Sequence, residues 1–510
     1  MTTQIDSTRM RYLLAAISGV LLALSFPNAA IEPLIFVALA PLIVALQRAR
    51  SSREAFLLAT FSSTITWLIN VPWVIKVMSY YGGLPYPLGV LIYVAMAIYL
   101  SLYAGILFGL PVYRLRLTSS FWPWLLVPAS WVALEFVRTH LLNGFPWNMV
   151  AVAIIELRPM VQLASIVGPY AVGYLIVLPS ALLAWLLVTE SPRSSKLAPV
   201  GGVALLYMLW VVSGLLMTGY QDRSAAAESK SIAALIQPNI TQQMRWDTEK
   251  VYELFDRMTM MTDIAIRRGA AVVVWPESTV PLTYLATDHY RSYIESVSRR
   301  GNVDVILGSV AEDEGDSTRI FNAAYLVSQG RTTGRYDKIK LVPFGEFVPF
   351  RKLLFFAEKL VRTVGTFQPG LAALPLQGRF SYGPAICYEV VYPQLTKAQI
   401  ARGADVLVTI TNDGWFGGTS APRQHLNMAR LRAVEGDRYL LRAATTGISA
   451  LVDPTGRIVE SLPENTAGTI MARFAPRHTR TPYVRYGDWF AISSCIALIV
   501  GIFLRRAALR

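Results

Sequence analysis

The sequence has few charged residues, and this shortage excludes a simple soluble protein. Charged residues make up 16% of the 510 residues, whereas an average soluble protein has about 25%. A chain with so few charges cannot cover one globular domain with a polar surface, so much of its apolar surface must lie in lipid. The length also suggests more than one domain.

Cysteine and histidine are too sparse for a disulfide framework or a metal site. The two cysteines are Cys387, in a polar region, and Cys495, in an apolar run expected to lie in a bilayer. They should not meet, so Cys387 is expected to be a free thiol. The four histidines are scattered, and none pairs with another at metal-ligand spacing. The sequence therefore predicts neither a metal nor a cofactor.

The basic net charge does not indicate a nucleic-acid partner. The formal net charge is +14, but no block of Lys and Arg is interleaved with aromatic residues, as tracking a phosphate backbone would require. Many basic residues instead occupy short turns between apolar runs, where they orient a protein in a membrane. We therefore expect no nucleic-acid binding.

Two kinds of sequence divide the chain into three parts. Residues 1–220 contain seven apolar runs, residues 221–486 are mixed polar sequence, and residues 487–510 contain an eighth apolar run before a basic tail. About eight transmembrane helices are predicted, although several runs are shorter than the ~20 residues that span a bilayer unaided. The runs are Tyr12–Phe26, Pro33–Leu46, Ala55–Val77, Leu88–Tyr113, Phe121–Val137, Val161–Thr189, Leu197–Tyr220 and Trp489–Leu504.

The basic turns predict the orientation in the membrane. If eight helices cross, five basic clusters share one side, which the positive-inside rule makes cytoplasmic. Both termini are then cytoplasmic, and the polar domain lies outside, which in a bacterium is the periplasm. Lys76, Arg138 and Arg158 are exceptions on or near the other side. The clusters are Arg9/Arg11, Arg48/Arg50/Arg53, Arg114/Arg116, Arg193/Lys196 and Arg505/Arg506/Arg510.

The polar region is predicted to be an α/β domain. Seven short apolar runs indicate strands, four longer periodic stretches indicate helices, and Asp453–Gly456 (DPTG) indicates a hairpin turn. Strands are expected at Ile232–Ile236, Ala271–Trp275, Val303–Leu307, Ala323–Val327, Tyr382–Ile386, Val406–Ile410 and Ile448–Val452, and helices at Thr248–Arg268, His289–Arg299, Tyr392–Arg402 and Arg423–Glu435.

Three motifs each place a reactive side chain beside a strand-like run. Glu277 ends VVVWPE, where Pro276 stops the strand and leaves the carboxylate at its edge as a candidate base. Lys338 lies in DKIKLVPFGE, and its ammonium group could stabilise an oxyanion. Cys387 follows a strand in PAICYE, which would place its sulfur near backbone N–H groups. Each motif alone would suggest a solvated or structural residue; together they supply a base, a cation and a nucleophile.

As a set, these motifs resemble the nitrilase superfamily, whose members use a Glu–Lys–Cys triad in this chain order. The likeness continues through Thr411–Gly417 (TNDGWFG), Gln424–Glu435 and Thr446–Ala450, and it covers most of Ser231–Phe474. It implies an αββα sandwich. A nitrilase-like domain between seven apolar runs and an eighth is similar, over the whole chain, to the apolipoprotein N-acyltransferase family of the bacterial inner membrane.

The resemblance implies a function. Members of this family transfer an acyl chain from a phospholipid, typically phosphatidylethanolamine, to the N-terminal amine of a diacylglyceryl-cysteine apolipoprotein, the final step of lipoprotein maturation. The expected partners are this donor, this acceptor and membrane lipids. A thioester intermediate that serves two substrates predicts ping-pong kinetics.

The resemblance also implies roles for particular residues. The triad corresponds to Glu277, Lys338 and Cys387, and Glu346 is expected to orient Lys338 or Glu277 through a charge-assisted hydrogen bond. Further functional positions of the family match Tyr388, Glu389 and, for substrate binding, Trp246; Trp415 and Phe416, in a glycine-rich loop, are additional candidates for covering the site.

Three other functions stay open at this point. A membrane-tethered amidase that hydrolyses a C–N substrate would use the same triad with water as the acceptor. A transporter with an accessory domain would place charged or helix-breaking residues at the membrane midplane, where these runs offer little beyond Glu135 and Asn70. A binding domain without catalytic activity would not require the intact triad.

Overall fold

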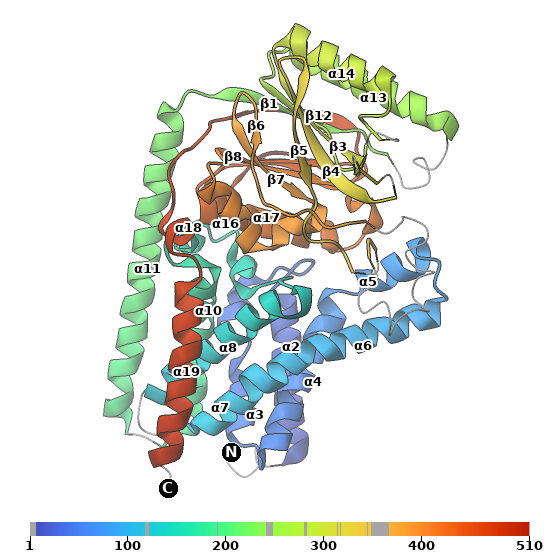
Figure 1. Cartoon of the computed structure of the whole chain (residues 1–510). Coiled ribbons are helices and arrows are strands. Elements are labelled where there is room, and N and C mark those ends of the chain that lie inside the picture. The colour runs from blue at the N-terminus through green and yellow to red at the C-terminus, as the bar shows by residue number, and fades with distance from the viewer. Residues whose placement is uncertain are drawn as a thin grey trace. The chain divides into compact units, whose positions relative to one another are not determined.

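The computed structural model contains two units (Figure 1). It describes residues 7–117, 122–190, 192–240, 248–279, 283–313, 315–316, 318–343, 345–347 and 367–508. The first unit comprises Met1–Ile75, Tyr86–Thr218 and Tyr486–Arg510, and the second comprises Lys76–Pro85 and Gly219–Arg485. A ten-residue segment between two apolar helices, Lys76–Pro85, therefore belongs to the second unit.

Apolar helices form the first unit. Their bounds are α2 (Thr8–Leu24), η1 (Glu32–Phe36), α3 (Ala40–Gln47), α4 (Ser52–Asn70), α5 (Trp73–Lys76), α6 (Tyr86–Ala104), η3 (Gly105–Gly109), α7 (Leu110–Leu115), α8 (Trp122–His140), η4 (Leu141–Asn143), η5 (Val150–Ile154), α9 (Arg158–Val161), α10 (Ala164–Val188), α11 (Arg193–Ala227) and α19 (Trp489–Ala508). The π-helical η2 (Val77–Tyr81) and most of α18 (Pro482–Tyr486) lie in the second unit.

The eight predicted crossings are not confirmed. By length and composition, four described helices could each cross a membrane: Tyr86–Leu115, Trp122–Asn143, Ala164–Val188 and Ser194–Ala225. A fifth crossing results if Ser52–Asn70 and Trp73–Tyr81, bent by 57°, form one span. The apolar stretches Glu32–Gln47 and Trp489–Arg505 are shorter. The first of them is divided between η1 and α3, where Pro41, which lacks an N–H, lies in the first turn of α3.

Two six-stranded sheets form the second unit. Their orders are β12-β1-β2-β3-β4-β5 and β11-β10-β9-β8-β7-β6. The central strands of each sheet are parallel, and the outer pairs are antiparallel. The strands are β1 (Ser231–Gln237), β2 (Val272–Val274), β3 (Asp304–Glu312), β4 (Ile320–Ser328), β5 (Arg331–Asp337), β6 (Leu376–Gln377), β7 (Ser381–Ile386), β8 (Val406–Thr411), β9 (Leu440–Ala444), β10 (Ser449–Val452), β11 (Ile458–Leu462) and β12 (Gly468–Phe474).

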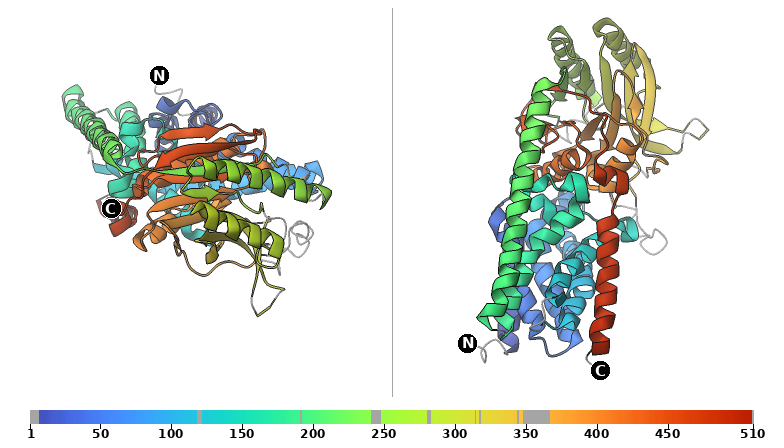
Figure 2. Two further views of the ribbon diagram at one scale, coloured as in Figure 1. Left: turned by 90° about the horizontal axis from the view of Figure 1, so that it is seen from above. Right: turned by 90° about the vertical axis from the view of Figure 1, so that its left-hand side faces the viewer.

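Both faces of the central strands are buried, which explains their unbroken apolar sequence. In β2, Val272 and Val274 pack against the other sheet, whereas Val273 packs with the helices of the outer layer. Helices α13 and α14 cover one sheet and α16 and α17 the other, so the layers run helix, sheet, sheet, helix (Figure 2). The helices are α13 (Thr248–Arg267), α14 (Asp288–Gly301), α16 (Pro393–Ala401) and α17 (Ala421–Gly436). The predicted α/β domain is confirmed.

Candidate active site

Glu277 emerges where β2 ends. The backbone N–H of Trp275 still donates to the carbonyl of Ile306 in β3 at 2.8 Å, and the following proline then ends the ladder. On β3, a Cβ added to Gly308 would lie 2.7 Å from the Glu277 Cα and 2.6 Å from the next backbone nitrogen. Glycine at position 308 therefore allows the Glu277 turn to lie directly against β3.

Lys338 follows β5 and is 1% exposed. Its backbone N–H donates to the Asn322 carbonyl at 2.8 Å, while its Nζ donates to Glu346 Oε1 at 2.8 Å and to Glu277 Oε1 at 3.4 Å. Burial opposes the charge, but the two carboxylates outweigh it and raise the pKa of Lys338. The lysine is therefore a fixed cation.

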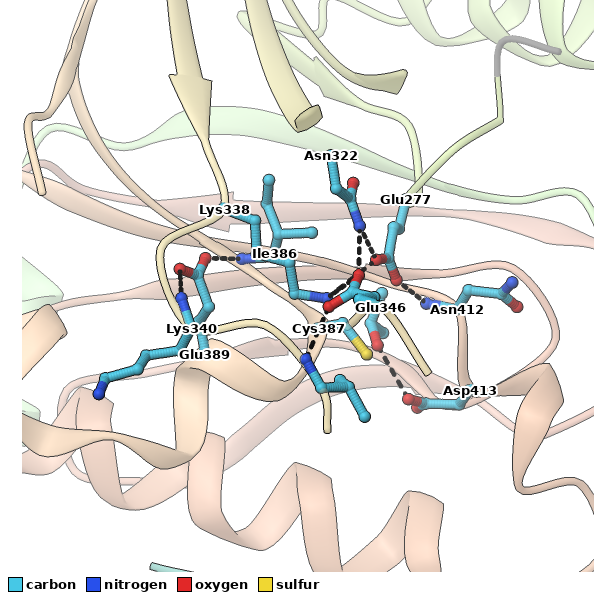
Figure 3. A network of polar contacts seen from close by, with 12 residues as sticks. Glu277, Asn322, Lys338, Lys340, Glu346, Ile386, Cys387, Glu389, Asn412 and Asp413 are labelled. Atoms are coloured by element: carbon cyan, nitrogen blue, oxygen red, sulfur yellow. Dashed lines mark hydrogen bonds and ion pairs between the residues drawn. The ribbon is translucent and has the colours of Figure 1, made fainter. Parts of the chain in front are cut away.

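Asn322 of β4 joins the two carboxylates (Figure 3). Its Nδ2 donates to Glu277 Oε1 at 2.7 Å and to Glu346 Oε1 at 3.0 Å. The second oxygen of each carboxylate accepts a backbone N–H: Glu277 Oε2 from Asn412 at 2.9 Å, and Glu346 Oε2 from Val342 at 2.8 Å. Both carboxylates are thus held in fixed orientations around the lysine.

Cys387 directly follows β7 and begins the 3₁₀ helix η7 (Cys387–Val391). Its φ of 52° lies in the left-handed region, which costs a residue with a Cβ roughly 1–2 kcal/mol. A sharp, strained turn from strand to helix is how a nucleophile elbow presents its side chain. The side chain is 7% exposed; this burial, together with the charge of Glu277, raises the pKa of the thiol. The resting nucleophile is therefore the neutral thiol.

Glu389 connects the chain segments that carry Lys338 and Cys387. Its Oε1 accepts the backbone N–H groups of the two residues after Lys338, at 2.6 and 3.1 Å, and the Tyr336 hydroxyl at 3.0 Å. Its Oε2 accepts the N–H of Ile386 at 2.8 Å. Burial raises the pKa of Glu389 to about 7, although the Ile386 N–H acts in the opposite direction. The relative position of lysine and cysteine thus depends on this one carboxyl group.

A second buried polar cluster lies behind the thiol. Asp413 accepts from Arg442 NH2 at 2.6 Å and from the Thr411 hydroxyl at 2.9 Å. His425 places Nδ1 3.1 Å from Asp413 Oδ1 and Nε2 3.1 Å from the Cys387 carbonyl oxygen. Arg442 NH2, which can only donate, also lies 3.1 Å from Nδ1. Because the Cys387 carbonyl can only accept, the imidazole carries a proton on Nε2 and donates it to that carbonyl, while Nδ1 lies between the Arg442 donor and the Asp413 carboxylate.

The charges of this cluster follow from its burial and its arginine. Burial alone would raise the pKa of Asp413, but the Arg442 charge dominates and lowers it. Burial and the same arginine lower the pKa of His425. The cluster is therefore an Asp–Arg ion pair with a neutral histidine, and it holds the main chain of the cysteine.

The predicted site residues fall into three groups. Glu277, Lys338, Glu346, Cys387 and Glu389 lie together (Figure 3). Tyr388 instead packs edge-on against Tyr392, with ring centroids 5.3 Å apart, and Trp415 and Phe416 lie in the loop after β8. A substrate contact for these aromatic residues stays a prediction. Trp246 lies outside the described residues.

Sequence reasoning assigned no role to Asn322, Asn412, His425 or Arg442. The available signal was a polar residue inside an apolar run: Asn322 interrupts β4, and Arg442 interrupts β9. Both side chains are buried, and a buried polar group in a strand requires a partner. The identity of that partner was not visible in the sequence.

Comparisons with known proteins match both parts of the chain. Residues 18–182 match the family model for the apolipoprotein N-acyltransferase N-terminal domain, and residues 232–482 match that for carbon-nitrogen hydrolases. The apolipoprotein N-acyltransferase of Geobacter metallireducens is 35% identical over 98% of this chain and 96% of its own. The enzyme of that name from Azotobacter vinelandii is 31% identical over the same shares.

Among solved structures, Saccharomyces cerevisiae Nit3, a nitrilase-superfamily member, is similar at 18% identity and a TM-score of 0.38, covering 48% of this chain and 90% of its own. The two full-length relatives carry the assignment, because their identity extends through the apolar helices as well as the polar domain. The chain belongs to the apolipoprotein N-acyltransferase family.

Proposed function

We propose that the protein transfers an acyl chain from a phospholipid to the N-terminal amine of a diacylglyceryl-cysteine lipoprotein, through a thioester on Cys387. The main support is a buried thiol beside a lysine that two carboxylates hold in place. The names of the relatives support a lipoprotein acceptor and a lipid donor. The catalytic triad of this reaction is Glu277, Lys338 and Cys387.

In the first half-reaction, the thiol attacks the ester carbonyl carbon of the donor while Glu277 accepts the thiol proton. A bond forms between Cys387 Sγ and this carbon, and the carbonyl electrons move onto oxygen. Lys338 and the backbone N–H of Tyr388 stabilise the oxyanion. When the oxyanion collapses, the ester C–O bond breaks and Glu277 returns the proton to the departing lyso-phospholipid. The products are lyso-phospholipid and an acylated Cys387.

In the second half-reaction, the amine of the lipoprotein attacks the thioester carbonyl. Glu277 takes a proton from the nitrogen, the C–S bond breaks, and the proton passes to the sulfur. The products are an amide and the original thiol. Because an amide is more stable than a thioester, the transfer runs downhill without nucleotide hydrolysis.

The site suits both half-reactions because its charges are fixed before substrate binds. Asn322 and Glu346 hold Glu277 and Lys338 in place. The raised pKa of the Cys387 thiol keeps the nucleophile protonated until Glu277 removes the proton. Deprotonation is thus coupled to attack on the carbonyl.

We assign the protein to the bacterial inner membrane, with the catalytic domain in the periplasm and both termini in the cytoplasm. If eight helices cross the membrane, the basic turns share one side, and this supports the orientation. The apolar helices hold the enzyme in the same bilayer as a phospholipid donor and a lipid-modified acceptor.

Intact mass spectrometry tests the covalent step. The wild type and Cys387→Ser are incubated with phosphatidylethanolamine in the absence of acceptor. We expect the wild type alone to gain the mass of one acyl chain, and hydroxylamine to remove it. No mass increase, with the protein folded and the lipid intact, would contradict a phospholipid donor.

Steady-state kinetics separate the transferase from a tethered amidase. A ping-pong transferase gives parallel double-reciprocal lines when donor and acceptor are varied. Intersecting lines would contradict the ping-pong scheme. Release of free fatty acid at a rate that the acceptor does not change would favour hydrolysis.

A further inference from the structure

The loop Asn412–Gly418, here the active-site loop, carries a backbone group that binds the proposed base. It follows β8, and its first residue donates its N–H to Glu277 Oε2 at 2.9 Å. The loop contains Gly414, Gly417 and Gly418. Residues Asp413–Trp415 form the 3₁₀ helix η8, which the Asn412 side chain caps. Because glycine leaves the backbone many conformations, contacts from outside restrict the rest of the loop further.

Two side chains of the segment Lys76–Pro85 supply such contacts. The Tyr81 hydroxyl donates to the Gly414 carbonyl at 2.8 Å, across 333 positions of sequence. Lys76 Nζ donates to the Gly417 carbonyl at 2.5 Å. The Tyr81 ring also lies edge-on to Trp415, with centroids 5.2 Å apart. The segment and the loop belong to the same unit of the fold.

The residue Gly414 connects Tyr81 to the proposed base through its two flanking peptide groups. While its carbonyl accepts from Tyr81, its N–H donates to Asn412 Oδ1 at 3.3 Å. The same Oδ1 accepts the Thr445 hydroxyl at 2.6 Å. Asn412 is therefore held through its side chain while its own N–H binds Glu277. Displacement of Gly414 would weaken one of the two bonds to the Asn412 side-chain oxygen that are described here.

We propose that Tyr81 and Lys76 are positioning residues, which hold the active-site loop so that the Asn412 N–H fixes Glu277 as the base for Cys387. The inference rests on the proposed function only in taking Glu277 as this base. It gives the segment Lys76–Pro85 a positioning role in catalysis. It also gives a reason for Lys76, one of the few basic residues that depart from the expected distribution across the membrane.

The test measures thiol reactivity separately from lipid turnover, in the full-length protein. With Cys495→Ser, Cys387 is the only cysteine. Iodoacetamide then forms a bond from its carbon to Sγ, iodide leaves, and the thiol proton passes to the base. Tyr81→Phe removes only a hydroxyl, and Lys76→Met removes the ammonium, whereas Lys76→Arg keeps a cationic donor. Tyr80→Phe is the matched control, because Tyr80 is adjacent but 63% exposed.

We expect Tyr81→Phe and Lys76→Met each to slow two reactions by the same factor: alkylation by iodoacetamide and acylation by phosphatidylethanolamine. The loss of one hydrogen bond corresponds to a rate about threefold to tenfold lower. The KM for the phospholipid donor should stay unchanged. Lys76→Arg and Tyr80→Phe should stay close to the wild-type rates, which shows that the donor group matters rather than the integrity of the segment.

Wild-type alkylation rates in both Tyr81→Phe and Lys76→Met would overturn the inference. Slower acylation with an unchanged alkylation rate, or with a raised KM for the donor, would also overturn the inference. Either result would assign the two residues to lipid binding. If the wild type is not acylated at all but Tyr81→Phe still slows alkylation, the proposed function fails while the positioning role stands.

Discussion

At the scale of single residues, the charged side chains around Lys338 form a cluster with one excess negative charge. Lys338 is a cation between the carboxylates of Glu277 and Glu346. A thiolate beside this cluster would add a further negative charge, which is consistent with the raised pKa of Cys387. Transfer of the thiol proton to Glu277 leaves the total charge unchanged and places the negative charge on sulfur. The arrangement therefore favours proton transfer within the triad over loss of the proton to solvent.

Asn322 tests whether the orientation of the two carboxylates matters. It donates to both of them, and hydrogen bonds to charged groups contribute about 1.5–3 kcal/mol each. We expect Asn322→Ala to lower the rate of Cys387 acylation about tenfold to a hundredfold, measured by rapid quench and mass spectrometry. A wild-type acylation rate in a folded Asn322→Ala protein would show that Lys338 and the backbone suffice.

His425 gives the site a pH dependence of definite sign. Its pKa is lowered in the folded protein, so below its ordinary value of about 6.5 the unfolded chain binds more protons than the folded one. Stability conferred by neutral His425 is therefore present above about pH 6.5 and is lost as pH falls.

The corresponding variant is His425→Gln, which does not titrate. We expect its unfolding temperature in detergent to fall less than that of the wild type between pH 7.5 and pH 5.5. An equal or larger fall in His425→Gln would contradict the assignment of a neutral, buried imidazole.

At the scale of secondary-structure elements, the site is assembled from the ends of strands. Glu277 follows β2, Lys338 follows β5, Cys387 follows β7 and Asn412 follows β8. Four functional groups from strand ends of both sheets thus meet at the site, and none of them is carried on a long loop. Elements buried on both faces position such groups more rigidly than exposed loops would.

Gly308 tests the close packing of the Glu277 turn on β3. Any Cβ at this position would lie under 3.0 Å from three backbone atoms of Pro276, Glu277 and Ser278, and the turn would have to move. Displacing a catalytic group by about 1 Å can cost about a hundredfold in rate. We expect Gly308→Ala to lower acylation by about this factor. As a control, Gly219→Ala changes a glycine of α11 that has open space around its missing Cβ and no positive φ, and it should leave acylation unchanged.

The strands and helices that carry the site were predictable from short apolar runs and longer periodic stretches. Pro276 also marked the end of the strand before Glu277. The seven expected strands and four expected helices of the catalytic domain are present, with ends shifted by a few residues. Four other strands, β5, β6, β9 and β12, were not expected, and β11 is the second strand of the hairpin expected at Asp453–Gly456. For two of the four the cause is clear. β5 (RTTGRYD) is polar because it lies at a sheet edge, and β9 (LLRAA) has the buried Arg442 at its centre. Neither sequence has the apolar pattern of a strand.

The polar partners of the site were not predictable, because they depend on which strand ends meet. Arg442 binds Asp413 across 29 positions, and Asn322 binds Glu277 across 45. No local pattern encodes such a pair. The same limit applies to the segment Lys76–Pro85, which hydropathy groups with the apolar helices but which packs with the catalytic domain.

At the scale of the whole molecule, the proposed function requires the catalytic domain to lie on the periplasmic side. Leu371 is fully exposed in this domain, and Ser194 lies exposed in the first turn of α11, beside the basic cluster Arg193/Lys196. In a background of Cys387→Ser and Cys495→Ser, we expect Leu371→Cys to react with a membrane-impermeant maleimide on intact spheroplasts. Ser194→Cys should react only after permeabilisation. The reverse pattern would contradict the orientation.

The central claim is that Cys387 carries the acyl group between two substrates. The most direct measurement is a single-turnover discharge: acylated enzyme is separated from phospholipid, then mixed with a diacylglyceryl-cysteine peptide. The account predicts that the enzyme loses one acyl mass while the peptide gains the same mass at its terminal amine, in equal amounts. An acyl-enzyme that survives the peptide, or that loses its acyl group only to water, would contradict it.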